Sequence, residues 1–206
     1  MNAADFPKPL GLYLASLPIV ELTLEHAADT KFYSIGEEYV LKVTPRKAEL
    51  KQEKERVDAL QGLLPVPTSI FFYEDEEKGY YLRTKLPGKS LLSCLDKPEE
   101  VVNYLVEAIN LLHQVKNVNF DNSRSVGTIF VHGDLCLPNI IVNDGKISGF
   151  VDLGDCGRGD PWMDISWALW SLEFNLHDKR YGQMLLDKLG LPFIESKYNN
   201  YVASRF

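Results

Sequence analysis

Short apolar runs separated by turn residues characterise the first part of the chain, and this pattern is typical of β-strands. The runs are Phe32–Ile35, Tyr39–Val43, Ile70–Tyr73 and Tyr80–Lys85. Between the second and third runs, apolar residues recur with helical spacing from about Arg46 to Leu60, and the pattern stops before Gly62 and Pro65. The sequence therefore predicts two pairs of strands with a helix between the pairs.

Helical periodicity dominates the remainder of the chain. One apolar stripe consists of Val102, Leu105, Val106, Ile109 and Leu112. Asp96 is the expected N-cap of this helix, because Glu99 follows three residues later and completes a capping box. Two further helices are predicted, over about Trp162–Asn175 and Asp178–Leu189.

A change of composition near residue 87 marks a boundary between two lobes. The 206 residues are 45% apolar and 25% charged, which is ordinary for a globular protein and sufficient for a sizeable core. We therefore predict an α+β fold with a β-rich N-terminal lobe, residues 1–86, and a mainly helical C-terminal lobe, residues 87–206.

The net charge of −7 argues against nucleic acid or an anionic membrane as the main partner. It is compatible with a cationic small substrate, although an acidic surface explains it equally well. No apolar run approaches the roughly 20 residues of a membrane span, and no basic region precedes a long apolar core at the N-terminus. We expect a cytoplasmic protein. The spacing of its three cysteines indicates neither disulfides nor a zinc site.

Asp144-Gly145 is a strong hairpin signal between the apolar runs Ile140–Val142 and Ile147–Val151. A two-residue turn pairs Asn143 with Lys146, and the same register places Asn139 opposite Phe150. Asp152 then falls on the face of Asn139, roughly 7–8 Å away diagonally. An amide oxygen and a carboxylate converging at the open end of a hairpin suit Mg²⁺, which prefers oxygen ligands and keeps several waters.

Lys42 lies within a predicted strand, and Glu53 projects from the apolar stripe of the helix that follows. A carboxylate on such a face is costly to bury unless it is paired, and Lys42 is the nearest logical partner. The pair can hold the lysine ammonium for phosphate oxygens or serve as an ordinary structural salt bridge. The sequence leaves both interpretations open.

Three motifs in the C-terminal half resemble those of one enzyme family. They are H-G-D-L-C-L-P-N-I over 132–140, D-G-K-I-S-G-F-V-D-L-G over 144–154 and G-R-G-D-P-W-M-D-I over 157–165. The chain resembles the aminoglycoside 3′-phosphotransferases, which are antibiotic kinases with a two-lobed protein-kinase-like fold. The spacing of Asp134 and Asn139 is also that of the protein-kinase catalytic loop.

The resemblance implies a role for each polar residue of these motifs. Asp134 would accept or orient the proton of the attacking hydroxyl. Lys42 would contact the α- and β-phosphates of ATP, and Glu53 would position Lys42. Asn139 and Asp152 would hold the Mg²⁺ that bridges the phosphates.

The same resemblance implies where the nucleobase binds. The connector around Thr84 and Leu86 would contact adenine through backbone groups, and Ile141 and Val151 would form the floor of the pocket. We expect His132 to brace the catalytic loop by hydrogen bonding rather than to transfer protons.

The family pattern is incomplete in two places. The family carries a long helical insertion that forms part of the antibiotic pocket, whereas here only residues 115–129 occupy that position, and their composition predicts a loop. The family also usually places an aromatic residue two positions before the lysine, where this chain has Val40. Tyr39 is adjacent, but strand alternation directs it to the other face.

Few acidic residues remain as candidates for binding the acceptor. Asp160 either faces the substrate or belongs to a charge network with Arg158 and Asp164. Asp178 and the terminal carboxylate of Phe206 are the other two candidates.

These observations predict transfer of a phosphoryl group from ATP to a hydroxyl of a small molecule. An aminoglycoside is the leading acceptor by resemblance, and an amino sugar, a nucleoside or another small alcohol remains open. The alternative is a nucleotide-binding pseudokinase or regulatory module without an acceptor pocket. A third hypothesis is a defective remnant with exposed apolar surface where the insertion normally packs.

Overall fold

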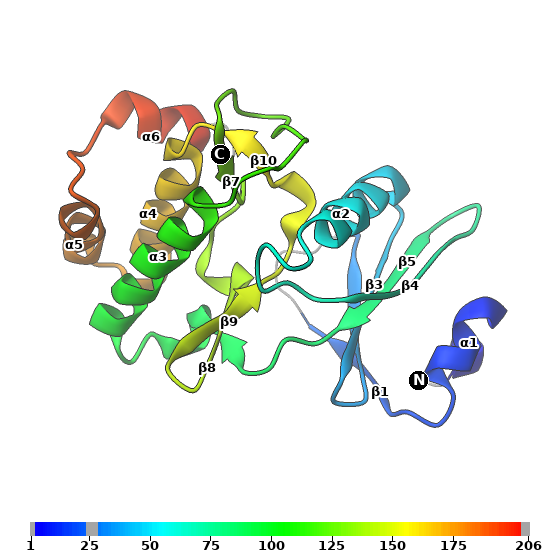
Figure 1. Ribbon diagram of the computed structural model, residues 1–206. Helices are drawn as coiled ribbons and strands as arrows, with labels where there is room; N and C mark the ends of the chain where they lie inside the picture. Colours follow the sequence, from blue (N-terminus) through cyan, green and yellow to red (C-terminus); the bar gives the residue numbers. More distant parts are fainter. Residues whose placement is uncertain (1–2, 24–28, 203–206) are drawn as a thin grey trace. The chain divides into compact units, whose positions relative to one another are not determined.

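The computed structural model describes residues 3–23 and 29–202. The chain forms two compact units (Figure 1). The first comprises Met1–Gln61 and Pro67–Leu86, and the second comprises Gly62–Val66 and Pro87–Phe206. An antiparallel sheet dominates the first unit and helices dominate the second, which confirms the predicted α+β fold.

A five-stranded antiparallel sheet with the order β1-β2-β3-β5-β4 forms the first unit. Its strands are β1 (Ile19–Leu22), β2 (Lys31–Ile35), β3 (Tyr39–Thr44), β4 (Ser69–Glu74) and β5 (Gly79–Thr84). Strands β2 to β5 confirm the predicted ones. Strand β1 was not predicted, because its four residues lack clear alternation and become a strand by pairing with β2.

One face of this sheet is covered by α1 (Lys8–Leu14), a helix that the sequence does not signal because it contains Pro9 and Gly11. Leu10 and Leu14 of this helix are fully buried in the core of the unit. The core also contains Tyr33, Ile35, Leu41, Val43, Tyr80 and Leu82. Burial of two leucines, at about 2 kcal/mol each, therefore outweighs the poor helix propensity of this short segment.

Helix α2 (Lys47–Ala59) confirms the predicted helix and packs against β4 and β5. Leu50 and Val57 are buried together with Glu53, as the apolar stripe indicates. The carboxylate of Glu53 meets Lys42, whose neighbours Leu41 and Val43 point into the α1 core. Strand alternation therefore places α2 on the face opposite α1.

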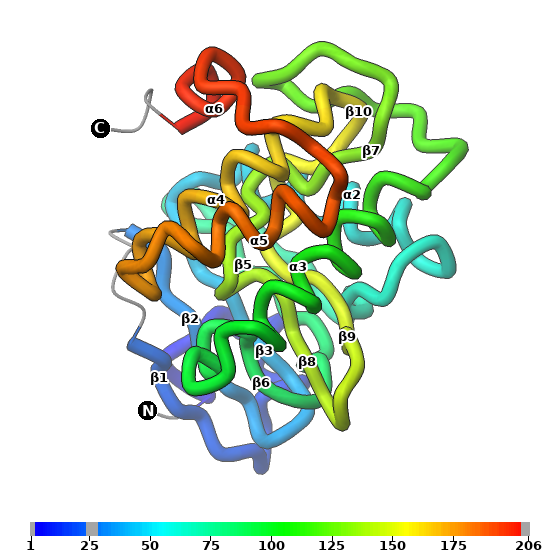
Figure 2. Tube along the Cα trace, turned by 90° about the vertical axis from the view of Figure 1, so that its left-hand side faces the viewer, coloured from blue at the N-terminus to red at the C-terminus, as the bar shows by residue number. Residues whose placement is uncertain are grey.

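Four helices form most of the second unit in the described part of the chain. They are α3 (Pro98–His113), α4 (Trp162–Leu176), α5 (Lys179–Leu189) and α6 (Glu195–Val202). Helix α5 packs against both α3 and α4, and α6 packs against α4 (Figure 2). Trp162 and Trp167 are buried, and Trp170 packs against the core cluster of Trp167 from a partly exposed position.

The start of α3 differs from the prediction by one residue. Lys97 is the N-cap and makes no capping bond through its side chain, and Pro98 is the first helical residue. Proline at this position already has a helical φ and lacks the N–H that a cap would satisfy, so the Asp96 cap is not needed.

Short strands complete the second unit. Strands β6 (Lys89–Ser90), β8 (Ile140–Asn143) and β9 (Lys146–Phe150) form one sheet, and β7 (Ile129–Val131) pairs with β10 (Gly157–Gly159). Short 3-10 helices are η1 (Ala3–Asp5), η2 (Leu91–Cys94), η3 (Leu137–Asn139) and η4 (Leu153–Asp155).

Residues 114–128 form a loop without helix or strand, which confirms the loop predicted for residues 115–129 except at Ile129, the first residue of β7. The loop is held to β10 by backbone hydrogen bonds from Asn122 N–H to Arg158 O, 2.9 Å, and from Arg158 N–H to Phe120 O, 3.1 Å. The guanidinium of Arg124 donates to the carbonyl of Gly133 and to the carboxylate of Asp155, both at 2.7 Å. The shortened segment is therefore an integral part of the unit.

Within residues 3–23 and 29–202, no helix is both long and apolar enough to cross a lipid bilayer.

Candidate active site

The loop from β7 to β8 carries the first motif, and His132 braces it as expected. The imidazole is fully buried, its Nδ1 accepts a hydrogen bond from the N–H of Asp134, 3.3 Å, and its Nε2 lies 2.9 Å from the carbonyl of Val151. The neutral Nε2–H tautomer satisfies both bonds. The ring therefore connects the loop to the end of β9.

Asp164, at the start of α4, anchors the same loop through hydrogen bonds to its backbone. Its two carboxylate oxygens accept hydrogen bonds from the backbone N–H groups of His132 and Gly133, both at 3.0 Å. The side chain is fully buried, and Nε2 of His113 lies 3.3 Å from it. A buried carboxylate is stable only with such partners, so Asp164 fixes the backbone that precedes Asp134.

Replacing Asp164 with asparagine should destabilise the second unit. The amide keeps the shape but directs an NH₂ group at one of the two backbone N–H donors, leaving it buried and unsatisfied. We expect the free energy of unfolding to fall by about 3 kcal/mol, measured by urea denaturation. Asp187→Asn, at an exposed position on α5, is the control and should change it by less than about 0.5 kcal/mol. Equal stability of both variants would contradict the anchoring role.

Asp134 and Asn139 are joined directly. The side-chain N–H of Asn139 donates to the backbone carbonyl of Asp134, 2.8 Å, and lies 3.5 Å from its carboxylate. The thiol of Cys136 also lies 3.5 Å from the other carboxylate oxygen. Since the amide nitrogen of Asn139 is used in this way, its Oδ1 is the atom available for a cation.

The hairpin that follows has the predicted turn but not the predicted register. Asn143 pairs with Lys146 as expected, whereas a β-bulge at Ser148 shifts the remaining pairs by one residue. Ile140, rather than Asn139, therefore pairs with Phe150. Glycine within a strand often marks a bulge, and Gly149, beside the shift, has φ of 155°.

The bulge changes how Asn139 and Asp152 come together. The N–H of Val151 donates to the carbonyl of Asn139, 3.0 Å, and Asp152 follows in the left-handed conformation with φ 59° and ψ 52°. Both residues lie outside the ladder, so the face-sharing argument based on strand alternation was wrong. A backbone bond and a left-handed residue bring the two positions together instead.

The oxygen donors of these two residues fit a magnesium ion. Asn139 offers an amide oxygen and Asp152 an exposed carboxylate. Among the described residues, no group of three or more His, Cys, Asp or Glu side chains could hold a metal by itself. Mg²⁺ is typically bound by one or two protein oxygens, with phosphates and waters completing its shell, so this donor set suits it.

In the first unit, the predicted pair of Lys42 and Glu53 is present. The ammonium nitrogen lies 2.6 Å from Oε2 of Glu53, whose side chain is 2% exposed. Its other oxygen, Oε1, lies 2.6 Å from Nη1 of Arg83. Arg83 was not predicted as a member of this site, because an arginine in a strand ordinarily faces solvent.

The residues proposed to contact adenine lie in two segments of the chain, the connector and the hairpin of β8 and β9. In the connector, the N–H of Thr84 donates to Thr68 O, 2.9 Å, and that of Lys85 to Glu38 O, 2.7 Å. These two amides are therefore already engaged, and the carbonyls and Leu86 are the better candidates for binding a base.

In the second unit, Ile141 and Val151 are partly exposed, while Ile140, Val142 and Phe150 between and beside them are buried. This alternation leaves one apolar face of the hairpin open, as the floor of a nucleobase pocket requires. On β3, Tyr39 packs against the α1 core and Val40 faces the other side, as predicted.

Each described acceptor candidate has a cationic partner. Asp160 pairs with Lys197 of α6 at 2.9 Å and also accepts from Trp162 N–H, 3.0 Å. Asp178 is the N-cap of α5 and pairs with Arg180 at 2.7 Å, and the hydrogen bond from that guanidinium lowers the pKa of the carboxyl. Phe206 lies outside the described residues.

The expected network of Arg158, Asp160 and Asp164 is not a single network. Arg158 pairs with Asp121 at 2.7 Å, Asp160 with α6, and Asp164 with the catalytic loop. The three residues bind different partners because Arg158 lies in β10, Asp160 between β10 and α4, and Asp164 in the first turn of α4.

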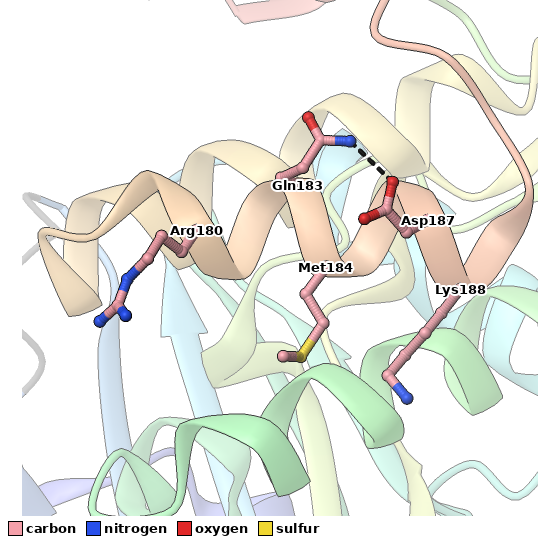
Figure 3. A pocket seen from close by; sticks show the side chains of 5 residues that line it. All are labelled: Arg180, Gln183, Met184, Asp187 and Lys188. Atoms are coloured by element: carbon pink, nitrogen blue, oxygen red, sulfur yellow. Dashed lines mark hydrogen bonds between the residues drawn. The ribbon is translucent and has the colours of Figure 1, made fainter.

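A surface pocket of about 480 Å³ lies along α5 (Figure 3). Its lining residues are Arg180, Gln183, Met184, Asp187 and Lys188. Gln183 and Asp187 bind each other at 2.8 Å, and Met184 and Lys188 extend toward α3. None of the candidate catalytic, metal or nucleotide residues lines this pocket, so we assign it no role in the chemistry.

The fold and the motif residues define a phosphotransferase of the protein-kinase-like class. The model of the phosphotransferase enzyme family matches residues 22–127 and 124–194. The chain therefore belongs to this family and is an ATP-dependent phosphotransferase that acts on a hydroxyl group.

Curated relatives confirm the resemblance drawn from the motifs. A probable aminoglycoside 3′-phosphotransferase of Lactococcus lactis is 25% identical over 241 aligned positions, covering 95% of this chain and 92% of the relative. An aminoglycoside 3′-phosphotransferase of Enterococcus faecalis is 24% identical, covering 75% of this chain and 77% of its own.

Solved structures share the fold. An aminoglycoside 3′-phosphotransferase of type VIII superposes with a TM-score of 0.76 at 18% identity, covering 96% of this chain and 93% of the other. An aminoglycoside phosphotransferase of Streptomyces rimosus, in complex with ADP and streptomycin, gives a TM-score of 0.73 at 18% identity, covering 96% and 92%. The two-lobed protein-kinase-like fold is thereby confirmed.

Proposed function

We propose that this protein transfers the γ-phosphoryl group of ATP to a hydroxyl of an aminoglycoside in a Mg²⁺-dependent reaction. The observation that carries the proposal is the placement of Asp134, which is held by a buried scaffold beside Asn139. A protein that only bound nucleotide would not need a carboxylate there. Antibiotic resistance would be the consequence, and the cytoplasm, which supplies ATP, is the compartment we propose.

Asp134 acts on the acceptor in this proposal. Its carboxylate orients the acceptor hydroxyl and takes its proton while the hydroxyl oxygen bonds to the γ-phosphorus. The bond from that phosphorus to the β,γ-bridging oxygen breaks, and ADP leaves. The Cys136 thiol and the Asn139 amide each lie 3.5 Å from the Asp134 carboxylate and hold it in place, so little reorganisation is needed when the acceptor arrives.

The remaining residues bind and orient the nucleotide. Lys42, held by Glu53, neutralises charge on the phosphates. Asn139 and Asp152 would hold Mg²⁺, which supplies charge neutralisation at the phosphate oxygens when bound. Thr84, Leu86, Ile141 and Val151 are proposed to contact adenine.

The described residues do not identify the acceptor, because Asp160 and Asp178, the candidates for binding it, both pair with neighbouring cations. We propose an aminoglycoside on the strength of the relatives named above. The alternative, a nucleotide-binding module without turnover, is favoured by the short loop at 114–128, which occupies the place of the family's acceptor-binding insertion.

An acceptor panel tests the proposal. The protein is incubated with Mg·ATP and aminoglycosides that differ in their number of amino groups, alongside an amino sugar and a nucleoside, and ADP release is measured. Acceptor-dependent release that disappears in Asp134→Asn is the expected result. Tight binding of Mg·ATP without acceptor-dependent release would establish the binding module instead. Failure to bind nucleotide together with a non-cooperative melt would indicate a defective remnant.

A further inference from the structure

Arg124, in the loop between α3 and β7, contacts two segments of the candidate active site. One nitrogen of its guanidinium, Nη2, lies 2.7 Å from the carbonyl oxygen of Gly133 and 2.7 Å from Oδ2 of Asp155. Gly133 directly precedes Asp134, the proposed base. Asp155 ends the 3-10 helix η4, which follows Asp152, the proposed magnesium ligand. Because Nη2 carries two N–H groups, one for each oxygen, a single nitrogen joins the two segments.

The peptide group between Gly133 and Asp134 is held at both ends. Its carbonyl accepts the hydrogen bond from Arg124, and its N–H donates to Nδ1 of His132, 3.3 Å. The orientation of this planar group sets the direction in which the Asp134 side chain leaves the backbone. Arg124 therefore helps to determine where the carboxylate of the proposed base points.

The same loop binds η4 through a second side chain. The backbone carbonyl of Asp155 accepts a hydrogen bond from the side-chain amide of Asn122. Asn122 is 5% exposed, and its Oδ1 accepts a hydrogen bond from the N–H of Arg124, 2.7 Å. The carboxylate and the backbone of Asp155 are thus both bound by one short stretch of the loop.

The catalytic loop and η4 approach each other closely at this point. A Cβ atom at Gly133 would lie 2.5 Å from the carbonyl oxygen of Asp155 and 2.8 Å from Nδ2 of Asn122. The φ of Gly133 is also left-handed, 88°, so glycine is required there on two grounds. The two segments therefore meet backbone to backbone, and Arg124 binds both of them at this junction.

The ion pair of Arg124 and Asp155 is partly accessible, since the two side chains are 36% and 40% exposed. A pair with this exposure contributes little to the free energy of unfolding. Its location between the two segments therefore matters more than its contribution to stability.

We propose that Arg124 is a positioning residue, which holds the catalytic loop against η4 so that Asp134 and Asp152 keep a fixed separation during phosphoryl transfer. The short loop thereby contributes to the active site although it lacks the family's insertion. This role rests on the proposed function, in which Asp134 is the base and Asp152 holds Mg²⁺.

Arg124→Met removes both hydrogen bonds and keeps an unbranched side chain. We expect kcat with Mg·ATP and the best acceptor to fall by about tenfold, because small displacements of reacting groups are costly. Adenosine binding should be unchanged, since the nucleoside has no phosphates and needs neither the base nor the metal. The melting temperature should stay close to that of the wild type. Loss of turnover with unchanged nucleoside binding separates positioning from general destabilisation.

Chemical rescue tests whether the guanidinium group itself is needed. Arg124→Ala leaves space for a free guanidinium ion at a partly exposed site. Guanidinium chloride at low concentration should raise kcat of this variant by about threefold or more, whereas sodium chloride at equal ionic strength should not. Arg124→Lys retains the charge but lacks the planar fork, so it should recover only part of the turnover.

Hydrogen exchange of the ligand-free protein measures the connection without any turnover. In Arg124→Met, peptides that contain Gly133 and peptides that contain Asp155 should both exchange faster, because each segment loses a hydrogen bond to the loop. Peptides from α5 should exchange as in the wild type.

Arg158→Met is the matched control. It removes a guanidinium that binds the same loop through Asp121, 2.7 Å, in a pair whose side chains are 45% and 66% exposed. This variant should keep kcat within about twofold of the wild type and should leave exchange at Gly133 and Asp155 unchanged.

Thermal melts are recorded first for every variant, and if Arg124→Met does not fold, Arg124→Lys and the rescue of Arg124→Ala decide. Wild-type kcat in the methionine variant, or faster exchange in only one of the two segments, would overturn the role of Arg124 while leaving the phosphotransferase function intact. Equal loss of turnover and adenosine binding would show a purely structural arginine. Absence of acceptor-dependent turnover by the wild-type protein would overturn the proposed function itself, and the role of Arg124 with it.

Discussion

Replacing Asp134 with asparagine is expected to lower kcat by about a thousandfold, within the range usual for loss of a general base. Asparagine keeps the size of the side chain and leaves the backbone carbonyl that binds Asn139 in place. It cannot accept a proton, however, and it orients the acceptor hydroxyl less well. The affinity for Mg·ATP should change by less than about threefold, because Asp134 contributes to the reaction rather than to nucleotide binding.

Steady-state kinetics with ATP and the best acceptor of the panel measure the first effect, and calorimetric titration with a non-hydrolysable ATP analogue measures the second. Asp144→Asn is the matched control, because Asp144 is exposed in the turn of the same hairpin and its left-handed φ of 48° is tolerated by asparagine. Turnover of Asp134→Asn within threefold of the wild type would exclude Asp134 as the base.

Replacing Asp152 with asparagine should uncouple nucleotide binding from Mg²⁺. The wild-type protein is expected to lose most of its ATP affinity when Mg²⁺ is removed with a chelator. Asp152→Asn loses the only carboxylate of the proposed donor set, so its ATP affinity should be nearly the same with and without Mg²⁺. We expect kcat/KM to fall by about a hundredfold or more.

The backbone conformation at Asp152 tolerates asparagine. Its φ of 59° is left-handed, and asparagine adopts that conformation as readily as aspartate. Loss of the side-chain charge can therefore be measured without new backbone strain, and a melting curve of the variant is the control that it is folded. An ATP affinity that responds to Mg²⁺ as strongly as in the wild type would show that Asp152 is not a ligand.

Local patterns were sufficient for much of the fold. The turn at Asp144 and Gly145, and the pair of Asn143 with Lys146, follow from adjacent residues because a two-residue turn leaves one register for the first pairs. The bulge lies beyond the second pair, where the turn no longer fixes the register. Gly149 was the signal that could have indicated it.

Of the two buried ion pairs of Glu53, one follows from local sequence patterns and the other does not. Lys42 and Glu53 are eleven residues apart on consecutive elements, so helix periodicity and strand alternation together predict their contact. Arg83 is thirty residues from Glu53, and its position depends on β5 pairing with β3 rather than with a later strand. No local sequence pattern predicts that β5 pairs with β3. The alternation of side chains along β5 is equally consistent with an exposed arginine.

The residues that carry the proposed chemistry are recognisable from the chain alone, because catalysis demands particular side chains at short, fixed spacings such as those of Asp134, Asn139 and Asp152. Contacts between distant segments decided the main anchors around them. Asp164 anchors the catalytic loop from about thirty residues away, and Lys197 of α6 neutralises the acceptor candidate Asp160. Such partners are selected by burial and by the need to satisfy charge, which depend on the packed tertiary structure rather than on neighbouring residues.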